Sequence, residues 1–181
     1  PVNSGDFYWE ATLGEFRSDE QYKNSHFISD KSVQQGVFLN KIKDDTMFAL
    51  LHNYLAAKHI ESERYNEAMR EIDLALALDS KFPEAHNNKG IIYSNLKDYK
   101  SAINSYDRAL ELHPNFTLAY VNKGIAFQKS GNYSSAIDMY TDALAIESDF
   151  KPLYLLRSKL YKKIGLYEKA LEDINKYESL N

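Results

Sequence analysis

The residue types that could carry chemistry are few in this sequence and lie far apart. The histidines are His26, His52, His59, His86 and His113. His52 and His59 are seven residues apart and could share a helix face, but no paired acid stands at a metal-ligand spacing beside them. The sequence has no cysteine, which removes disulfides, thiolate zinc sites and cysteine nucleophiles from this chain. We therefore expect neither a metal site nor a cofactor.

Other chemical signatures are weak. The sequence has no glycine-rich phosphate loop and no serine–histidine constellation that would activate a nucleophile. Asn115 and Asn132 begin glycosylation patterns, but both fall at expected turns, where asparagine is favoured for structural reasons. We predict no enzymatic activity for these residues and leave open an enzymatic parent protein.

Composition indicates a packed, soluble chain. Hydrophobic residues make up 44% and charged residues 27% of the sequence. A net charge of −4 argues against nucleic-acid binding through phosphates. No apolar run approaches the roughly 18 residues that a membrane span needs, so we expect no membrane insertion and a cytoplasmic or periplasmic protein. The first residue is Pro1 instead of methionine, which points to a fragment or a processed product.

A period of 34 residues runs through most of the chain. Tyrosines recur at this spacing, and alanines follow three residues after them. The aligned columns include Tyr65, Tyr99, Tyr133 and Tyr167, then Ala68, Ala102, Ala136 and Ala170. The period divides the chain into units at residues 49–82, 83–116, 117–150 and 151–181, with residues 1–48 outside it.

Each unit is predicted to fold as two helices joined by a short turn. In the second unit, apolar and small residues recur at helical spacing on both sides of a Leu-Lys-Asp-Tyr turn, and Pro114 ends the second helix. Gly90 and Ala102 are expected to let the two helices approach closely. A large side chain at Ala102 would then overpack the contact, at a cost of about 1–3 kcal/mol.

This pattern resembles the tetratricopeptide (TPR) repeat family. The third unit carries the family's aromatic and small residues at Tyr120, Gly124, Phe127, Ala136, Tyr140 and Ala143. The first unit departs from it with Ala56 at the glycine position and His59 at an aromatic position, and the fourth has Ser158 at the glycine position. The resemblance implies an all-α fold, a right-handed TPR superhelix of four helix-turn-helix repeats behind a short irregular N-terminal segment.

The resemblance also implies a function, since TPR proteins bind protein segments in a concave groove lined by the first helix of each repeat. The groove positions that it assigns are Leu50, Asn53, Ala57, Glu61, Glu84, Asn87, Ile91, Asn95, Leu118, Val121, Asn122, Ile125, Lys129, Leu155, Lys159, Lys162 and Lys163. Aliphatic residues in the middle and lysines at one end favour an apolar partner segment with a negative end. The alternative is that some of these residues belong to the core.

The last unit ends without a solvating helix. Ile174, Tyr177 and Leu180 are therefore candidates for an exposed apolar edge through which copies of the chain self-associate. The alternative is that these side chains fold back on their own helix pair.

Residues 1–48 carry another pattern. The aromatic run from Phe7 is predicted to form a strand that ends at the turn residue Gly14, and Ser18 is a candidate helix N-cap. One interpretation is a small cap over the first helix pair.

The other interpretation of this segment is a resemblance to the C-terminal end of a bacterial transglutaminase-like, papain-type domain. There an acid followed two residues later by threonine completes a cysteine–histidine–acid triad, and Glu10 and Thr12 match that pair. The main prediction is thus a protein–protein interaction module that binds a protein or peptide. The alternative is the TPR portion of a cysteine enzyme, where the repeats recruit substrate or pack on the catalytic domain.

Overall fold

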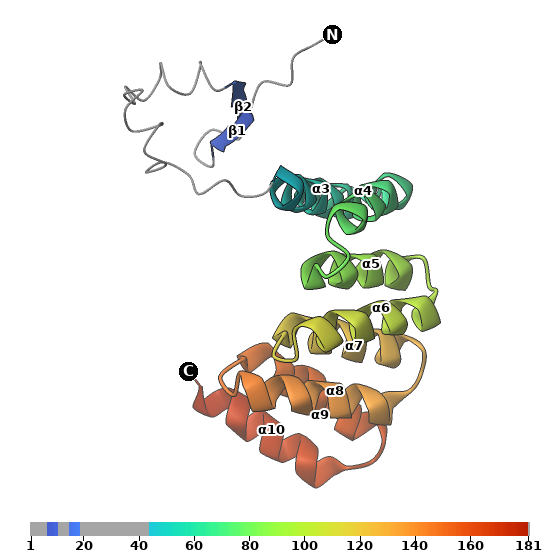
Figure 1. The fold of residues 1–181 in the computed structure, drawn as a ribbon. Helices are drawn as coiled ribbons and strands as arrows, with labels where there is room; N and C mark the ends of the chain where they lie inside the picture. Colours follow the sequence, from blue (N-terminus) through green and yellow to red (C-terminus); the bar gives the residue numbers. More distant parts are fainter. Residues whose placement is uncertain (1–6, 11–14, 19–43, 181) are drawn as a thin grey trace. The chain divides into compact units, whose positions relative to one another are not determined.

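The structure, a computed structural model, describes residues 7–10, 15–18 and 44–180 (Figure 1). The chain divides into two units, Pro1–Lys43 and Asp44–Asn181, and each is described by itself.

The N-terminal unit contains a two-stranded antiparallel sheet. Strand β1 (Phe7–Glu10) pairs with β2 (Glu15–Ser18), so that Phe7 lies opposite Ser18 and Glu10 lies opposite Glu15. The strand predicted from the aromatic residues is confirmed for Phe7–Glu10. Ser18 lies in β2, and the helix predicted after it falls outside the described residues, as do Thr12 and Gly14.

The second unit consists of helices arranged in antiparallel pairs that stack one on the next (Figure 1). The helices are α3 (Asp44–Glu61), α4 (Tyr65–Leu78), α5 (Pro83–Asn95), α6 (Tyr99–Leu112), α7 (Thr117–Lys129), α8 (Tyr133–Ile146), α9 (Lys151–Lys163) and α10 (Tyr167–Ser179). This arrangement confirms the predicted all-α array of helix-turn-helix repeats. Helix α3 begins at Asp44, ahead of the predicted boundary at residue 49, whereas α5, α7 and α9 begin at residues 83, 117 and 151.

The turns inside the pairs share one backbone geometry. Gly131 and Gly165 have φ angles of 88° and 82°, in the left-handed region that glycine enters without a steric cost. Glu63 and Lys97 stand at the same repeat position with φ angles of 57° and 64°. The fold therefore imposes this turn even where the residue disfavours it.

Inside each central pair, a glycine of the first helix lies against a tyrosine ring of the second. A Cβ atom added to Gly90 would lie 2.4 Å from Cε1 of Tyr106, and one added to Gly124 would lie 2.5 Å from Cε1 of Tyr140. Both tyrosines are buried, and burial raises the pKa of Tyr140 to about 12, so its hydroxyl stays protonated at neutral pH. The close approach expected at Gly90 is thus made to a tyrosine ring.

The outer repeats change both partners of this contact together. Ala56 stands at the glycine position with Ile72 at the tyrosine position, and Ser158 stands there with Ile174. Both small residues are buried. In the first and fourth repeats the facing helix thus carries isoleucine in place of the larger tyrosine. This leaves room for a side chain at the glycine position.

Apolar clusters join consecutive repeats. Ile72 of α4 packs in one cluster with Phe82, which directly precedes α5, and with Ile92 of α5. Ile137 of α8 packs in another with Leu153 of α9. Each repeat therefore completes its core with residues of its neighbour, as expected for a linear repeat protein.

A polar bond also ties each second helix to the first helix of the next repeat. Each of these junction bonds connects residues sixteen apart in the sequence, at equivalent repeat positions. The bonded pairs are Lys89 with Asp73, Lys123 with Asp107, and Arg157 with Thr141. The three junctions thus share one antiparallel register.

The Gly124 contact gives the first prediction. Gly124→Ala should lower the free energy of unfolding by about 1–3 kcal/mol, because the added methyl overlaps a buried ring. In a Tyr140→Ile background, the same substitution should cost less than about 1 kcal/mol, since that pair then resembles Ala56 with Ile72. Urea unfolding of the unaltered chain, the two single variants and the double variant measures the coupling between the two positions. An equal loss of unfolding free energy from Gly124→Ala in both backgrounds would contradict the predicted coupling.

Candidate functional site

The first helices of the repeats form a continuous side of the array. Helix α3 contacts α5, and α5 contacts α7, while each second helix mainly meets the first helices of its own and the following repeat. In the first three repeats the first helices therefore lie next to one another along one side of the stack. We call the exposed predicted groove positions of the first helices the first-helix face, namely Leu50, Glu61, Glu84, Asn95, Leu118, Lys129, Lys159, Lys162 and Lys163.

Asparagine side chains connect the first helices. Asn88 Nδ2 donates to Asn53 Oδ1 at 2.8 Å, and Asn122 Nδ2 donates to Asn87 Oδ1 at 3.0 Å. The residues of each bond belong to neighbouring repeats. These amides therefore spend part of their hydrogen-bonding capacity inside the protein, and only the remaining donors and acceptors could meet a partner.

At the last junction the same positions are apolar. Val121 stands where Asn53 and Asn87 stand in earlier repeats, and Leu156 stands where Asn88 and Asn122 stand. Val121 and Leu156 both pack in the cluster that joins the third and fourth repeats. The residues at these positions thus change from hydrogen-bonded asparagines to apolar core residues at the last junction.

The predicted groove residues divide by exposure. Asn87 and Val121 are buried, Val121 at 8% exposure. The half-buried ones are Asn53, Ala57, Ile91, Asn122, Ile125 and Leu155. The exposed ones are Leu50, Glu61, Glu84, Asn95, Leu118, Lys129, Lys159, Lys162 and Lys163. Val121 and Ile125 contribute to the core, so substituting them would disturb folding as well as any surface.

The exposed part of this side is polar except at two leucines. Leu118 is 53% exposed on α7, and Leu50 is similarly exposed on α3. The sequence of α9 carries five basic residues and no acid. Lys163 Nζ lies 4.4 Å from the ring centroid of Tyr133, and Lys159 and Lys162 are exposed to solvent. The fourth repeat therefore presents positive charge toward the end of α9, and the third presents the exposed Leu118 near the start of α7.

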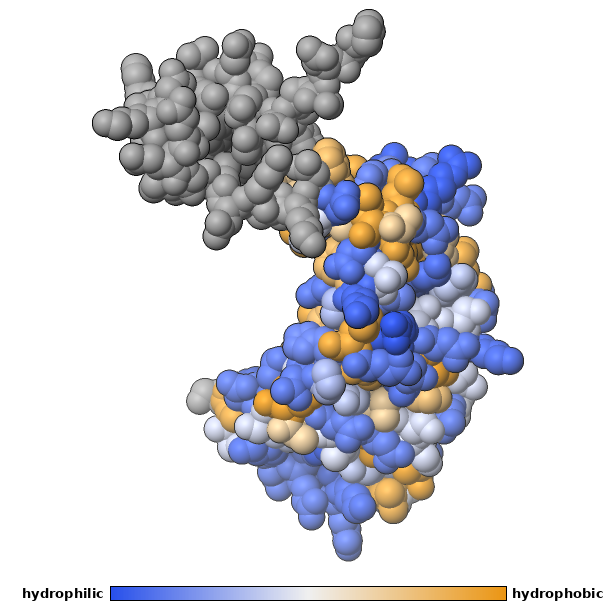
Figure 2. All heavy atoms as spheres, in the orientation of Figure 1, coloured by the Kyte–Doolittle hydropathy of each residue, from blue (hydrophilic) through white to orange (hydrophobic). Residues whose placement is uncertain are grey.

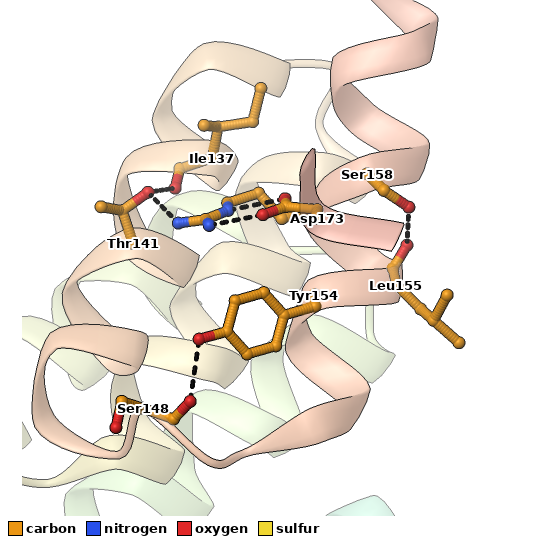
Figure 3. Close-up of polar contacts among 8 residues, drawn as sticks. Ile137, Thr141, Ser148, Tyr154, Leu155, Ser158 and Asp173 are labelled. Carbon is orange, nitrogen blue, oxygen red and sulfur yellow. Dashed lines mark hydrogen bonds and ion pairs between the residues drawn. The ribbon is translucent and has the colours of Figure 1, made fainter. Parts of the chain in front are cut away.

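A buried ion pair fixes the basic helix, and the sequence analysis missed it (Figure 3). Arg157 forms a two-pronged pair with Asp173 of α10, with Nη2 to Oδ1 at 2.7 Å and Nε to Oδ2 at 2.9 Å. Its Nη1 also donates to Thr141 Oγ1, and Thr141 in turn donates to the carbonyl of Ile137. The hydrogen bonds to Asp173 raise the pKa of Arg157 above its ordinary value. The signal in the sequence was that Arg157 occupies the position of Lys89 and Lys123.

Two further bonds in this region hold the entry and the body of α9 (Figure 3). Tyr154 Oη donates to the carbonyl of Ser148 at 2.8 Å, and Ser158 Oγ donates to the carbonyl of Leu155 at 3.0 Å. The bond of Tyr154 thereby ties α9 to the preceding turn, whereas the bond of Ser158 stays within the helix.

The histidines take separate partners. His52 Nδ1 lies 2.6 Å from Glu71 Oε2, while His86, at the same repeat position, bonds the carbonyl of Ser80. His113 stacks on Phe116, and His59 has a buried Nδ1 atom without a hydrogen-bond partner. Among the described residues, no three metal-ligating side chains gather in one place.

The C-terminal edge differs from the expected one. Tyr177 and Leu180 pack against the cluster of the third and fourth repeats, and Ile174 is half-buried, so the fold-back interpretation holds for the two packed residues. The exposed apolar residues are instead Tyr167 at 70% and Leu171 at 58% exposure. We call the exposed residues Tyr167, Leu171, Glu172 and Asn175 of α10 the trailing face.

No helix in the described part of the chain is long and apolar enough to cross a membrane.

Family models identify the repeats. Models described as tetratricopeptide repeat match residues 83–116, 119–152 and 152–181, which together make up more than half of the chain. The chain therefore belongs to the tetratricopeptide repeat family, whose members are in general non-enzymatic interaction modules. The matches begin at residue 83, and the preceding helices α3 and α4 form a pair of the same kind. A search of curated proteins found no match.

Solved structures share the fold. A crystal structure of MamA is 19% identical with a TM-score of 0.69, covering 92% of this chain and 96% of that one. MamA from Desulfovibrio magneticus RS-1, residue 41 to its end, is 25% identical with a TM-score of 0.65, covering 74% and 76%. A chain of the APC/C hetero-tetramer Cut9–Hcn1 is 20% identical with a TM-score of 0.67, covering 74% and 27%. These likenesses support the helical repeat architecture.

The Arg157 pair gives the second prediction. Its side chains are 14% exposed for Arg157 and 6% for Asp173, so Asp173→Asn would leave a buried guanidinium without its counter-charge. We expect a loss of about 3 kcal/mol in the free energy of unfolding. The matched control is Glu111→Gln, which removes the exposed pair with Arg108 and should cost less than about 1 kcal/mol. If urea unfolding shows similar losses of unfolding free energy for Asp173→Asn and Glu111→Gln, the pair of Arg157 and Asp173 does not stabilise the fold as proposed.

Proposed function

We propose that the chain binds a protein or peptide segment along the first-helix face, with an apolar part of the partner over the third repeat and an acidic part near α9. The observation that carries this proposal is the exposed Leu118 followed along the array by the exposed Lys159, Lys162 and Lys163. A surface that combines an exposed apolar side chain with charged residues favours specific docking.

The hydrogen-bonded asparagines support a groove that is already formed. The bonds Asn88 to Asn53 and Asn122 to Asn87 hold neighbouring first helices at a set spacing. A partner would therefore meet a pre-organised surface, which lowers the entropy lost on binding. The half-buried Ile91, Ile125 and Leu155 would then form its floor.

The alternative of a transglutaminase-like parent enzyme has a narrower basis. Among the described residues it depends on Glu10 in β1, because Thr12 lies outside them. The gene sequence upstream of Pro1 tests it. A cysteine and a histidine strand encoded there would support it, and a start codon directly before Pro1 would contradict it.

We further propose that copies of the chain self-associate through the fourth repeat, by way of the trailing face. The exposed Tyr167 and Leu171 support this, because equivalent residues of the third repeat are largely covered by α9. Light scattering over a rising protein concentration should show an increasing mean mass. A constant monomer mass would contradict the proposal.

The groove gives a further prediction. Random peptides displayed on phage and selected on the 181-residue chain should be enriched in segments that join aliphatic and acidic residues. Leu118→Glu should weaken binding of the selected peptides about tenfold or more, because it places a charge in the apolar patch.

The matched control is Leu74→Glu. Leu74 is a similarly exposed helical leucine, at 49%, but lies on the second helix α4. Its substitution should leave peptide binding unchanged. Peptides that bind Leu118→Glu as well as the unaltered chain, or no enrichment of any peptide, would contradict the proposed groove.

A further inference from the structure

Several exposed positions at the two ends of the helical array have equivalents that are buried at the junctions between repeats. On α3, we call Phe48, Tyr54, Leu55 and Lys58 the leading face. Leu55 is half-buried and the others are exposed. In Figure 2 a hydrophobic area is visible over the α3 and α4 end of the described chain.

Equivalent residues inside the array show what covers such positions. Phe82, one repeat after Phe48, is buried against the preceding repeat. At the other end, Ile137 is one repeat before Leu171 and is buried against α9. The leading face is thus the first-helix half of a repeat junction, and the trailing face is the second-helix half.

We propose that the trailing face of one copy receives the leading face of a second copy, so that the array continues from chain to chain. This inference rests on the proposed self-association and adds the surface, the orientation and the residue register of the contact. The occupant is a second copy because its α3 presents the positions that the internal junctions use, in the same order.

The junction bonds set the register. Leu55 is equivalent to Lys89, and Asn175 is equivalent to Asp73, so Leu55 of one copy lies opposite Asn175 of the other. The helices of a junction are antiparallel, as the short connections between them require. The contact between Lys163 and Tyr133 agrees with this, because it lies further along α9 and further back along α8 than the junction bond.

One turn further along, the register brings opposite charges together. Three residues after Leu55 is Lys58, and three residues before Asn175 is Glu172. Further along, the contact of Lys163 with Tyr133 is equivalent to one of Glu61 with Tyr167. One complementary charge pair, Lys58 with Glu172, therefore lies at the proposed contact.

The lysine is particular to the first repeat, while the position of Glu172 is exposed in every repeat, as Arg70, Asn104 and Asp138. At the position of Lys58, the internal repeats carry Ile92, Ala126 and Leu160, all buried. Lys58 is paired with Glu61 in an exposed i,i+3 arrangement, which contributes little and can be exchanged. A lysine that would be costly inside a junction thus meets an acidic residue of the trailing face in the proposed contact.

The geometry has a consequence for assembly. A contact between two different faces is heterologous, so each dimer keeps one free leading face and one free trailing face. The assembly should grow beyond the dimer and should weaken as salt screens the pair of Lys58 with Glu172.

Charge exchange tests the register. Lys58→Glu and Glu172→Lys each make the facing residues alike in charge, and each should weaken self-association about tenfold. The double variant restores an opposite pair and should recover the unaltered value. A mixture of the two single variants should also recover association, with the two kinds of chain alternating, because every contact between unlike chains then pairs opposite charges.

The matched control is Arg108→Glu on α6, an exposed helical position away from both faces. It should leave self-association unchanged. Circular dichroism should show the same helical signal for every variant, since all the substituted residues are exposed.

Each outcome of light scattering and sedimentation decides something. If the unaltered chain stays a monomer, the proposed self-association is wrong and this inference fails with it. If the chain associates but Lys58→Glu has no effect, the contact does not use the leading face and the register is overturned, whatever Glu172→Lys does. Recovery in the double variant supports the register, and a double variant as weak as the single ones overturns it.

Discussion

The register between each second helix and the next first helix is the constraint on which the array depends. The junction bonds join residues sixteen apart at three successive junctions, with lysine or arginine on the first helix and an oxygen acceptor on the second. Because the helices are rigid, one fixed pair sets every other contact along the junction. The apolar clusters then fill the space that this register leaves.

The same constraint positions the candidate binding surface. Stacking at a constant register brings α3, α5 and α7 into contact, and the asparagine bonds form where they meet. Within the fourth repeat, the pair of Arg157 and Asp173 holds α9, which carries the exposed lysines, on α10. The first-helix face is thus a product of the packing beneath it, with its exposed leucines and its lysines on different repeats.

Much of the fold could be predicted from the sequence, because a 34-residue period fixes helix pairs whatever the individual residues are. The candidate site could be predicted less well. Val121 and Asn87 stand at groove positions but are buried, since the first helices pack on each other there. The pair of Ala56 and Ile72 shows why burial was harder to predict. A contact depends on the residues at two facing positions, whereas the repeat period gives the residue type at each position separately. The exposure of Tyr167 and Leu171 was missed for the same reason, because it depends on whether another helix packs against their positions.

The register predicts which residues meet between copies, and a cross-linking measurement tests that most directly. The chain has no cysteine, so a Leu55→Cys chain and an Asn175→Cys chain each carry a single thiol. When the two are mixed with a short bismaleimide, the account predicts that most cross-linked dimers join one chain of each kind. Cross-linking that joins like chains as often as unlike ones would contradict it.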